Sequence, residues 1–322
     1  MKKSVTQAIF ISLLILSLIF IISCSKVAGG ETPPDTATRL KAVQTGTQGI
    51  VLRIMPNAPP SIIYDRNELV AIVDVDNKGN FPLEPTECFI QVTGFDPTII
   101  KGGMNYPHSC AENYPGIFEG KTVYNLNGGT NQIEFRSPNV ILPPGVQEYS
   151  PILNFLSCYH YHTIANPSVC VDPLFYQVSA QQKTCRPKDV PMGGGQGGPV
   201  GVTYVGVDMV GSRAIFEINI KNLGTPLGRV LSPFASLQNC GQSSLEYQDL
   251  DKVQFNVEMT GGGKVNCKPQ DGFVRLNNGQ GKIICTFDIP GASAFETPLL
   301  IDLDYSYAQS IQKNVRIVKT PQ

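Results

Sequence analysis

The chain has 322 residues, of which 16% are charged, and its formal net charge is −1. A chain without a basic surplus is not expected to hold nucleic acid or an anionic membrane surface through charge. Its 31 Gly and 25 Pro, with no long helical periodicity after the N-terminal segment, favour an all-β protein of about two domains.

The N-terminal segment predicts export. Lys2 and Lys3 precede an apolar run over residues 8–22, and roughly 15 residues is short for a bilayer-spanning helix, which needs about 20. The run ends in Ile-Ile-Ser-Cys at residues 21–24, which resembles a bacterial-type lipobox. By that resemblance, residues 1–24 are a lipoprotein signal, and Cys24 carries a diacylglyceryl group after cleavage. The alternative is an uncleaved anchor, and both place the remaining chain outside the membrane.

A short pattern in the first half of the chain recurs in the second. Residues 73–79 (VDVDNKG) and 218–224 (INIKNLG) both alternate apolar and polar side chains and then reach Asn-x-Gly. Period-two alternation predicts a strand with one buried face, and Asn and Gly tolerate the positive φ of a tight turn. Acidic residues in the first copy do not match a calcium-loop pattern, so they are expected to face solvent.

Two further landmarks repeat at an offset of 146 residues. Tyr159-His160-Tyr161 matches Tyr305-Ser306-Tyr307, and Val169-Cys170-Val171 matches Val315-Arg316-Ile317. Three landmarks in one order predict two copies of one domain, each a sandwich of about seven short strands. The expected boundaries are listed in chain order: a tether at 25–46, a first β-sandwich at 47–190, a linker at 191–199, and a second β-sandwich at 200–322. The Gly-rich linker lacks the Lys-Ser/Thr of a phosphate-binding loop.

The Asn-x-Gly strand near the start of each copy resembles those of immunoglobulin-like modules in microbial surface proteins, including the CARDB-type adhesion-related domains. The resemblance implies two tandem immunoglobulin-like sandwiches that act as a surface spacer or a binding module. It carries no catalytic residue over to this sequence.

Eight cysteines follow Cys24, and in an exported chain an even number predicts up to four disulfides. Cys267 and Cys285 flank an Asn-Asn-Gly hairpin signal and are the preferred pair. The other expected pairs are Cys88 with Cys110, Cys158 with Cys170, and Cys185 with Cys240.

The best candidate for metal chemistry is Cys158-Tyr159-His160-Tyr161-His162, because Cys158, His160 and His162 share one face of a strand. His108 is the third histidine. The second copy has Asp304, Ser306 and Ala308 at the equivalent positions, so the fold does not require these ligands. The sequence therefore predicts an exposed strand face with no metal or other cofactor.

These observations predict a membrane-anchored, extracytoplasmic, non-enzymatic module for binding or adhesion. Its expected partners are the membrane, through the N-terminal lipid or anchor, and a protein or other envelope component. The first domain, which has longer loops at 93–131 and both histidine clusters, is the favoured contact surface. The first alternative is a structural spacer subunit of a cell-envelope assembly. The second is a metal-assisted hydrolase that uses His160 and His162.

Overall fold

The structure is a computed structural model that describes residues 35–177, 182–240, 245–263, 265–291 and 293–320. The chain divides into two compact units, residues 1–39 and 40–322, and all the described strands lie in the second. The helix α2 (Thr36–Gln44) follows Asp35, whose carboxylate accepts a hydrogen bond from the Thr38 N–H at 2.8 Å. Part of the predicted tether is therefore helical. The predicted signal segment lies outside the described residues.

The described strands form an all-β fold, as predicted, and alternate inward apolar and outward polar side chains. One sheet orders β1 (Ile50–Ile54), β3 (Leu69–Asn77) and β6 (Thr130–Ser137). A second orders β10 (Val190–Pro191), β11 (Val200–Val210), β12 (Arg213–Asn222), β17 (Gln280–Asp288) and β15 (Val265–Lys268). A third orders β2 (Ile62–Tyr64), β19 (Arg316–Val318) and β7 (Glu148–Tyr149).

The fourth sheet is the central sheet, and it orders β16 (Phe273–Arg275), β14 (Lys252–Met259), β18 (Phe295–Asn314), β8 (Ile152–Ala165), β4 (Cys88–Thr93) and β5 (His108–Ser109). Two shorter strands, β9 (Ser168–Val171) and β13 (Arg229–Leu231), also pair with β18. The short 3-10 helices are η1 (Gly103–Asn105), η2 (Leu237–Asn239) and η3 (Tyr247–Asp249).

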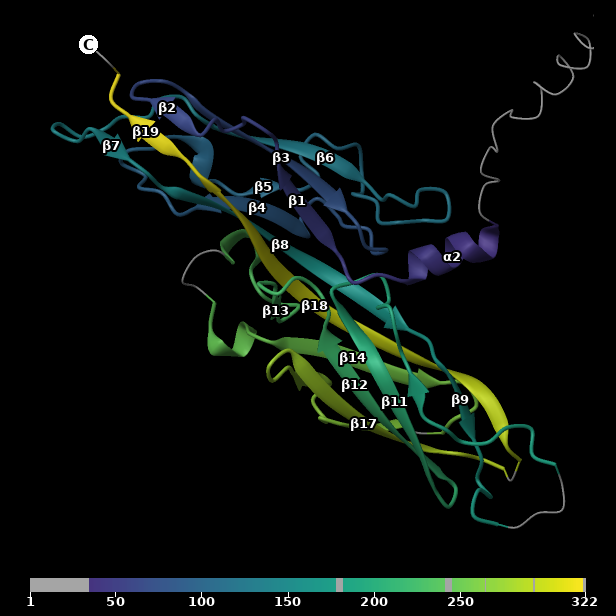
Figure 1. Cartoon of the computed structure of the whole chain (residues 1–322). Helices are drawn as coiled ribbons and strands as arrows, with labels where there is room; N and C mark the ends of the chain where they lie inside the picture. Colours follow the sequence, from purple (N-terminus) through teal and green to yellow (C-terminus); the bar gives the residue numbers. More distant parts are fainter. Residues whose placement is uncertain (1–34, 178–181, 241–244, 264, 292, 321–322) are drawn as a thin grey trace, which may run out of the picture. The chain divides into compact units, whose positions relative to one another are not determined.

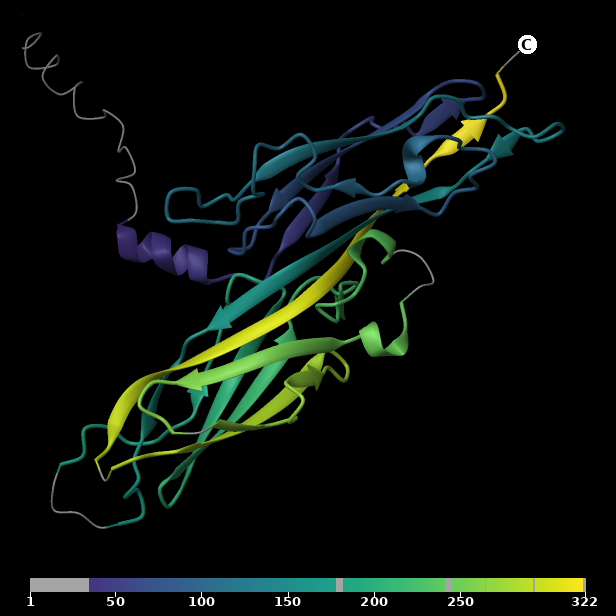
Figure 2. The same ribbon diagram turned by 180° about the vertical axis from the view of Figure 1, so that it is seen from behind.

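The two Tyr-x-Tyr motifs pair with each other at the centre of the molecule. The strands β8 and β18 run antiparallel over fourteen residue pairs, with Tyr159 opposite Tyr307 and Tyr161 opposite Tyr305. Figure 1 and Figure 2 show these two long strands side by side from opposite directions. All four tyrosine side chains are fully buried on one face of the central sheet. The repeat therefore generates a local two-fold arrangement around the β8–β18 pair.

The Asn-x-Gly motifs obey the same symmetry. The Tyr161 hydroxyl donates to Asn77 Oδ1 at 3.3 Å, and the Tyr307 hydroxyl donates to Asn222 Oδ1 at 3.0 Å. Each Asn side-chain oxygen also accepts from the N–H two residues later, at 3.3 Å and 3.1 Å. Two of the landmarks that revealed the repeat thus form one hydrogen-bonded unit in each copy.

The last strand of each copy pairs with a strand of the other copy. Val171 of β9 lies opposite Phe295 of β18, and Ile317 of β19 lies opposite Tyr149 of β7, which is the same pair shifted by 146 residues. The strands therefore form two lobes with strands from both copies: the first lobe includes the sheet of β2, β19 and β7, and the second includes β9 and the part of β18 that pairs with it. The predicted boundaries at 47–190, 191–199 and 200–322 do not separate the strand pairings, and one hydrophobic cluster extends through both lobes.

The Gly-rich segment predicted to be a linker is packed into the protein. Residues 195–198 are buried, and Gly46 exchanges hydrogen bonds with Gly194 and Gly197 at 2.7 and 2.9 Å. A Cβ on Gly198 would lie 2.4 Å from Thr163 Oγ1. These glycines are therefore explained by close packing between chain segments rather than by flexibility.

Four disulfides confirm the predicted number. The predicted Cys88–Cys110 and Cys267–Cys285 pairs are present, the second between directly opposed residues of β15 and β17. The predicted Cys158–Cys170 and Cys185–Cys240 pairs are wrong. Cys158 bonds to Cys240 and Cys170 to Cys185, because β8 continues to Ala165 and carries Cys170 into the second lobe. Four disulfides indicate an oxidising, extracytoplasmic environment.

Candidate functional site

The outer face of the central sheet, opposite the buried tyrosines, has two symmetry-related halves. The open half carries His160 and His162 on β8 and Asp302 and Asp304 on β18. The covered half carries their equivalents at the 146-residue offset: Leu156 and Cys158 on β8, and Ser306 and Ala308 on β18. One fold thus presents two different sets of side chains at equivalent positions.

The open half is an ordered grid of polar groups. Gln254 of β14, Asp304 of β18 and His162 of β8 form one row across three hydrogen-bonded strands. In the next row, Asn256 lies opposite Asp302. All four imidazole and carboxylate side chains are half-buried, with exposed fractions between 25% and 36%. Their backbone strands hold these groups in fixed register.

The histidines pair with the carboxylates diagonally across β8 and β18. His162 Nε2 lies 2.9 Å from Asp302 Oδ1, and His160 Nε2 hydrogen-bonds to Asp304 Oδ1. His160 Nδ1 also lies 3.7 Å from Glu87. The hydrogen bond to Asp304 raises the pKa of His160 above its ordinary value, and partial burial opposes that shift. Each imidazole therefore lies against its own carboxylate, and His160 is hydrogen-bonded to its partner.

Phe81 forms an aromatic wall beside this grid. Its ring centroid lies 5.5 Å from that of His162 and 6.3 Å from that of His160. The Asn77 amide donates to the Phe81 carbonyl at 2.8 Å, and the Phe81 N–H donates to the Tyr161 hydroxyl at 3.3 Å. The repeated Asn–Tyr unit therefore positions the aromatic ring. With Phe255, the grid and this ring line a cleft of about 410 Å³.

The covered half is closed by a segment of the second copy. Cys158 bonds to Cys240 in this segment, and the Gln91 side chain donates to the Gln238 carbonyl. A small apolar cluster lies beneath it, comprising Cys158, Leu231, Ala235, Cys240 and Ala308. The covered half is therefore part of the protein interior.

An insertion explains why only one half is closed. Phe89 and Gln254 are equivalent, because Phe89 lies opposite Cys158 and Gln254 lies opposite Asp304, the equivalent of Cys158. Asn77 precedes Phe89 by 12 residues, whereas Asn222 precedes Gln254 by 32 residues. The second copy thus has 20 additional residues between equivalent positions. These residues include the segment that crosses the covered half.

The sequence correctly placed Cys158, His160 and His162 on one strand face, but the structure does not join them as a ligand set. Cys158 is in a disulfide, and each histidine faces a different aspartate. His108 lies on β5 and contacts Glu112 at 2.6 Å. Over the described residues, no group of three or more His, Cys, Asp or Glu side chains is arranged to hold a metal. The positions of Phe81, Gln254 and Asn256 beside the histidines were not predicted, because their proximity depends on strand order.

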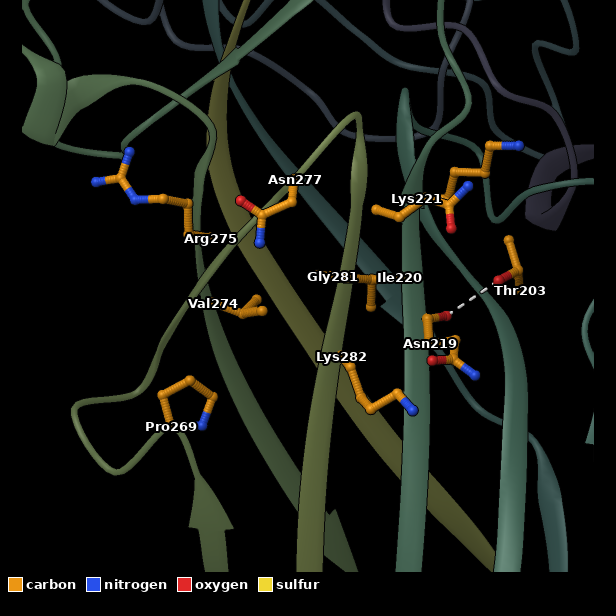
Figure 3. A pocket seen from close by; sticks show the side chains of 11 residues that line it. Thr203, Asn219, Ile220, Lys221, Pro269, Val274, Arg275, Asn277, Gly281 and Lys282 are labelled. Atoms are coloured by element: carbon orange, nitrogen blue, oxygen red, sulfur yellow. Dashed lines mark hydrogen bonds between the residues drawn. The ribbon is translucent and has the colours of Figure 1, made fainter.

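A larger groove of about 770 Å³ lies beside β12, β17 and the residues before β17. Figure 3 shows Lys221 and Arg275 directed to opposite sides of it. Lys282 contacts Glu217 at 2.7 Å, and Arg275 donates to the carbonyls of Tyr247 and Leu250 at 3.1 and 2.8 Å. The basic side chains of this groove therefore do not converge on one point, and Lys282 and Arg275 are already bound to other groups of the protein.

A third groove, of about 480 Å³, lies along β1, an edge strand of its sheet. The register with β3 places Leu52 and Ile54 where main-chain groups point away from that strand. Ile311 and Leu227 contribute apolar surface to the groove. This edge therefore offers main-chain groups that could pair with another strand.

Lipidation at Cys24 lies outside the described residues. None of the helices in the described ranges is long and apolar enough to cross a bilayer.

Comparisons with known proteins add little. No family model and no curated protein matches the chain. Among solved structures, it is similar to the secreted serine protease VesC from Vibrio cholerae, at 13% identity and a TM-score of 0.18. The similarity covers 82% of this chain and 51% of that chain, so the chain matches about half the length of that protein. A TM-score of 0.18 carries no argument about fold or activity.

Proposed function

We propose that the protein is a membrane-tethered, extracytoplasmic binding or adhesion module without enzymatic activity. The observation that carries this proposal is the open half of the central sheet. It is a recessed cleft that presents two histidine–aspartate pairs beside an aromatic ring, at positions where the other half of the same sheet is apolar and closed. A fold that closes this face in one half has no structural need for an exposed His–Asp grid in the other.

The absence of a catalytic role rests on the arrangement of the ionisable groups. In the open half, His160 and His162 each pair with a separate aspartate, so their nitrogens do not converge on one point. Hydrolysis needs a base, a nucleophile and a group that stabilises negative charge around one reacting atom. The paired arrangement supplies fixed hydrogen-bonding groups, which suit recognition better than this chemistry.

Site-specific photo-crosslinking in intact cells tests the proposal. A photoreactive residue at Asn256, on the open half, should give a discrete crosslinked product with an envelope component. The same residue at Ser212, in the exposed turn after β11, is the matched control and should give none. No product at Asn256, or the same products at both positions, would contradict the proposal.

A structural spacer subunit is the second candidate, and the edge of β1 favours it. If copies assemble by strand pairing, a photoreactive residue at Arg53 should crosslink two copies of the chain and double the apparent mass. A partner of different mass at Asn256, with no doubled species at Arg53, would favour the binding module. The reverse result would favour the spacer.

A further inference from the structure

We propose that the open half binds a neutral carbohydrate, which the His–Asp grid holds by its hydroxyl groups while Phe81 packs against a sugar ring. This inference rests on the proposed binding function and gives its ligand class. It follows from the kind of groups present, their charge balance and their surroundings.

Recognition here depends on side chains. At the grid, β14, β18 and β8 are paired to one another, with β18 between the other two strands. Its main-chain donors and acceptors are therefore used within the sheet. An extended peptide commonly binds by adding to a free strand edge, and the centre of this sheet does not offer one. The ligand must instead contact groups that project from a sheet face.

The available groups match a polyol. Asp302 and Asp304 accept hydrogen bonds, and Gln254 and Asn256 can donate and accept. Each sugar hydroxyl is likewise both a donor and an acceptor, so planar amides and carboxylates can bind two adjacent hydroxyls. The half-buried Phe81 ring supplies the apolar surface on which the C–H face of a sugar ring can pack.

The charge of the cleft favours a neutral ligand. Its lining residues include two aspartates and two histidines, and each aspartate lies against one histidine. None of the residues lining the cleft is a lysine or an arginine. An anionic ligand would therefore meet two carboxylates without a dedicated cation. A cationic ligand would compete with the imidazoles for the same oxygens.

The covered half supplies an internal comparison. At the four equivalent positions it has Leu156, Cys158, Ser306 and Ala308, and a polypeptide segment closes it through apolar contacts and a disulfide. A surface evolved to accept a peptide segment in this fold is thus apolar. The polar grid of the open half is chemically distinct from it, which favours a carbohydrate over a polypeptide.

Affinity electrophoresis of the full-length protein in non-ionic detergent tests the inference. The native gels contain one of four soluble probes: the neutral polysaccharides mannan, galactan and dextran, or the anionic polysaccharide alginate. At least one neutral probe should retard the protein. Asp304→Asn and Phe81→Leu should each weaken that retardation at least tenfold, whereas Tyr176→Ala, which alters an exposed aromatic outside the cleft, should leave it unchanged.

Folding of the variants is checked by intact mass without reduction, which should show four disulfides, and by circular dichroism. Retardation by alginate alone, by no probe, or to the same extent in all variants would overturn the carbohydrate inference. If Asn256 still crosslinks to an envelope protein in cells, the proposed binding function stands and only its ligand class fails. If neither assay detects a partner, both proposals fail.

Discussion

The two halves of the central-sheet face begin from equivalent positions in a duplicated sequence and end as different surfaces. In the covered half, Cys158 and Ala308 lie beneath a segment of the second copy. In the open half, their equivalents Asp304 and His162 line a cleft. The β8–β18 pairing is common to both halves, which differ in the side chains at these four positions and in the 20 additional residues of the second copy that include the covering segment. In this molecule, duplication conserved the buried tyrosine face and allowed the opposite face to diverge.

The largest expected effect on stability comes from breaking the disulfide that holds the second-copy segment over the covered half. Cys158→Ala with Cys240→Ala should lower the free energy of unfolding by about 2–5 kcal/mol, since this disulfide joins residues 82 apart. The matched control, Cys267→Ala with Cys285→Ala, opens a loop of 18 residues and should cost about 1 kcal/mol less in the chain-entropy model. Urea denaturation measures both. Limited proteolysis should cleave within residues 232–250 in the first variant. An equal decrease in the free energy of unfolding in both variants would mean that apolar packing, rather than the disulfide, holds this segment over the covered half.

A smaller effect tests whether the two copies are equivalent at their shared landmarks. Tyr161→Phe and Tyr307→Phe each remove one hydroxyl that donates to an Asn side chain, so each should cost about 1 kcal/mol. The two variants serve as controls for each other in thermal or urea denaturation. A large cost in only one of them would show that the hydrogen-bonded unit has diverged together with the outer face.

A third experiment converts part of the open half to the covered sequence. Asp302→Leu with His162→Ala introduces the residues found at the equivalent positions 156 and 308, and should change the free energy of unfolding by less than about 1 kcal/mol. Asp302→Leu alone should cost more, because it leaves the half-buried His162 without its partner. If the double variant is the less stable one, the grid contributes to folding and its presence in the open half does not point to binding.

The smallest effect is a pH dependence confined to the open half. The pKa of His160 is raised by Asp304, with a contribution from Glu87, whereas its equivalent Ser306 does not titrate. A raised pKa in the folded state stabilises the protein below the unfolded value of about 6.5, and this stabilisation is lost as the pH rises through the folded value. The free energy of unfolding should therefore be lower at about pH 8 than at about pH 6. This difference should be smaller in His160→Gln. If the unchanged protein and His160→Gln have the same pH profile of stability, His160 is not the source of the pH dependence.

Local sequence patterns predicted the strands and the repeat but not how the two copies combine. Alternation located the strands around Asn77 and Asn222, and both are present. Alternation does not say which strand is the partner, so the pairing of the two Tyr-x-Tyr strands with each other was not predicted. The Gly-rich composition of the predicted linker had two physical explanations, flexibility and close packing, and the structure shows the second.

The same limit applied to the disulfides and to the candidate site. Cys267 and Cys285 are close in sequence and flank a hairpin signal, so their pairing was predicted. Cys158 and Cys240 come together only because a segment of one copy crosses the other. The two histidines were recognised from their spacing on one strand. Phe81 and Gln254 join them through tertiary arrangement, which leaves no local pattern in the sequence.

The exchange of the last strands also determines when the protein can finish folding. The first lobe needs β19, at the end of the chain, to pair with β2 and β7 near its beginning. Because a polypeptide is synthesised from its N-terminal end, the sheets of the first lobe stay incomplete until β19 has been made. Contacts between such distant residues slow folding and leave strand edges exposed. Synthesis of this protein thus includes an interval in which unpaired strand edges are exposed, which a series of independently folding domains would avoid.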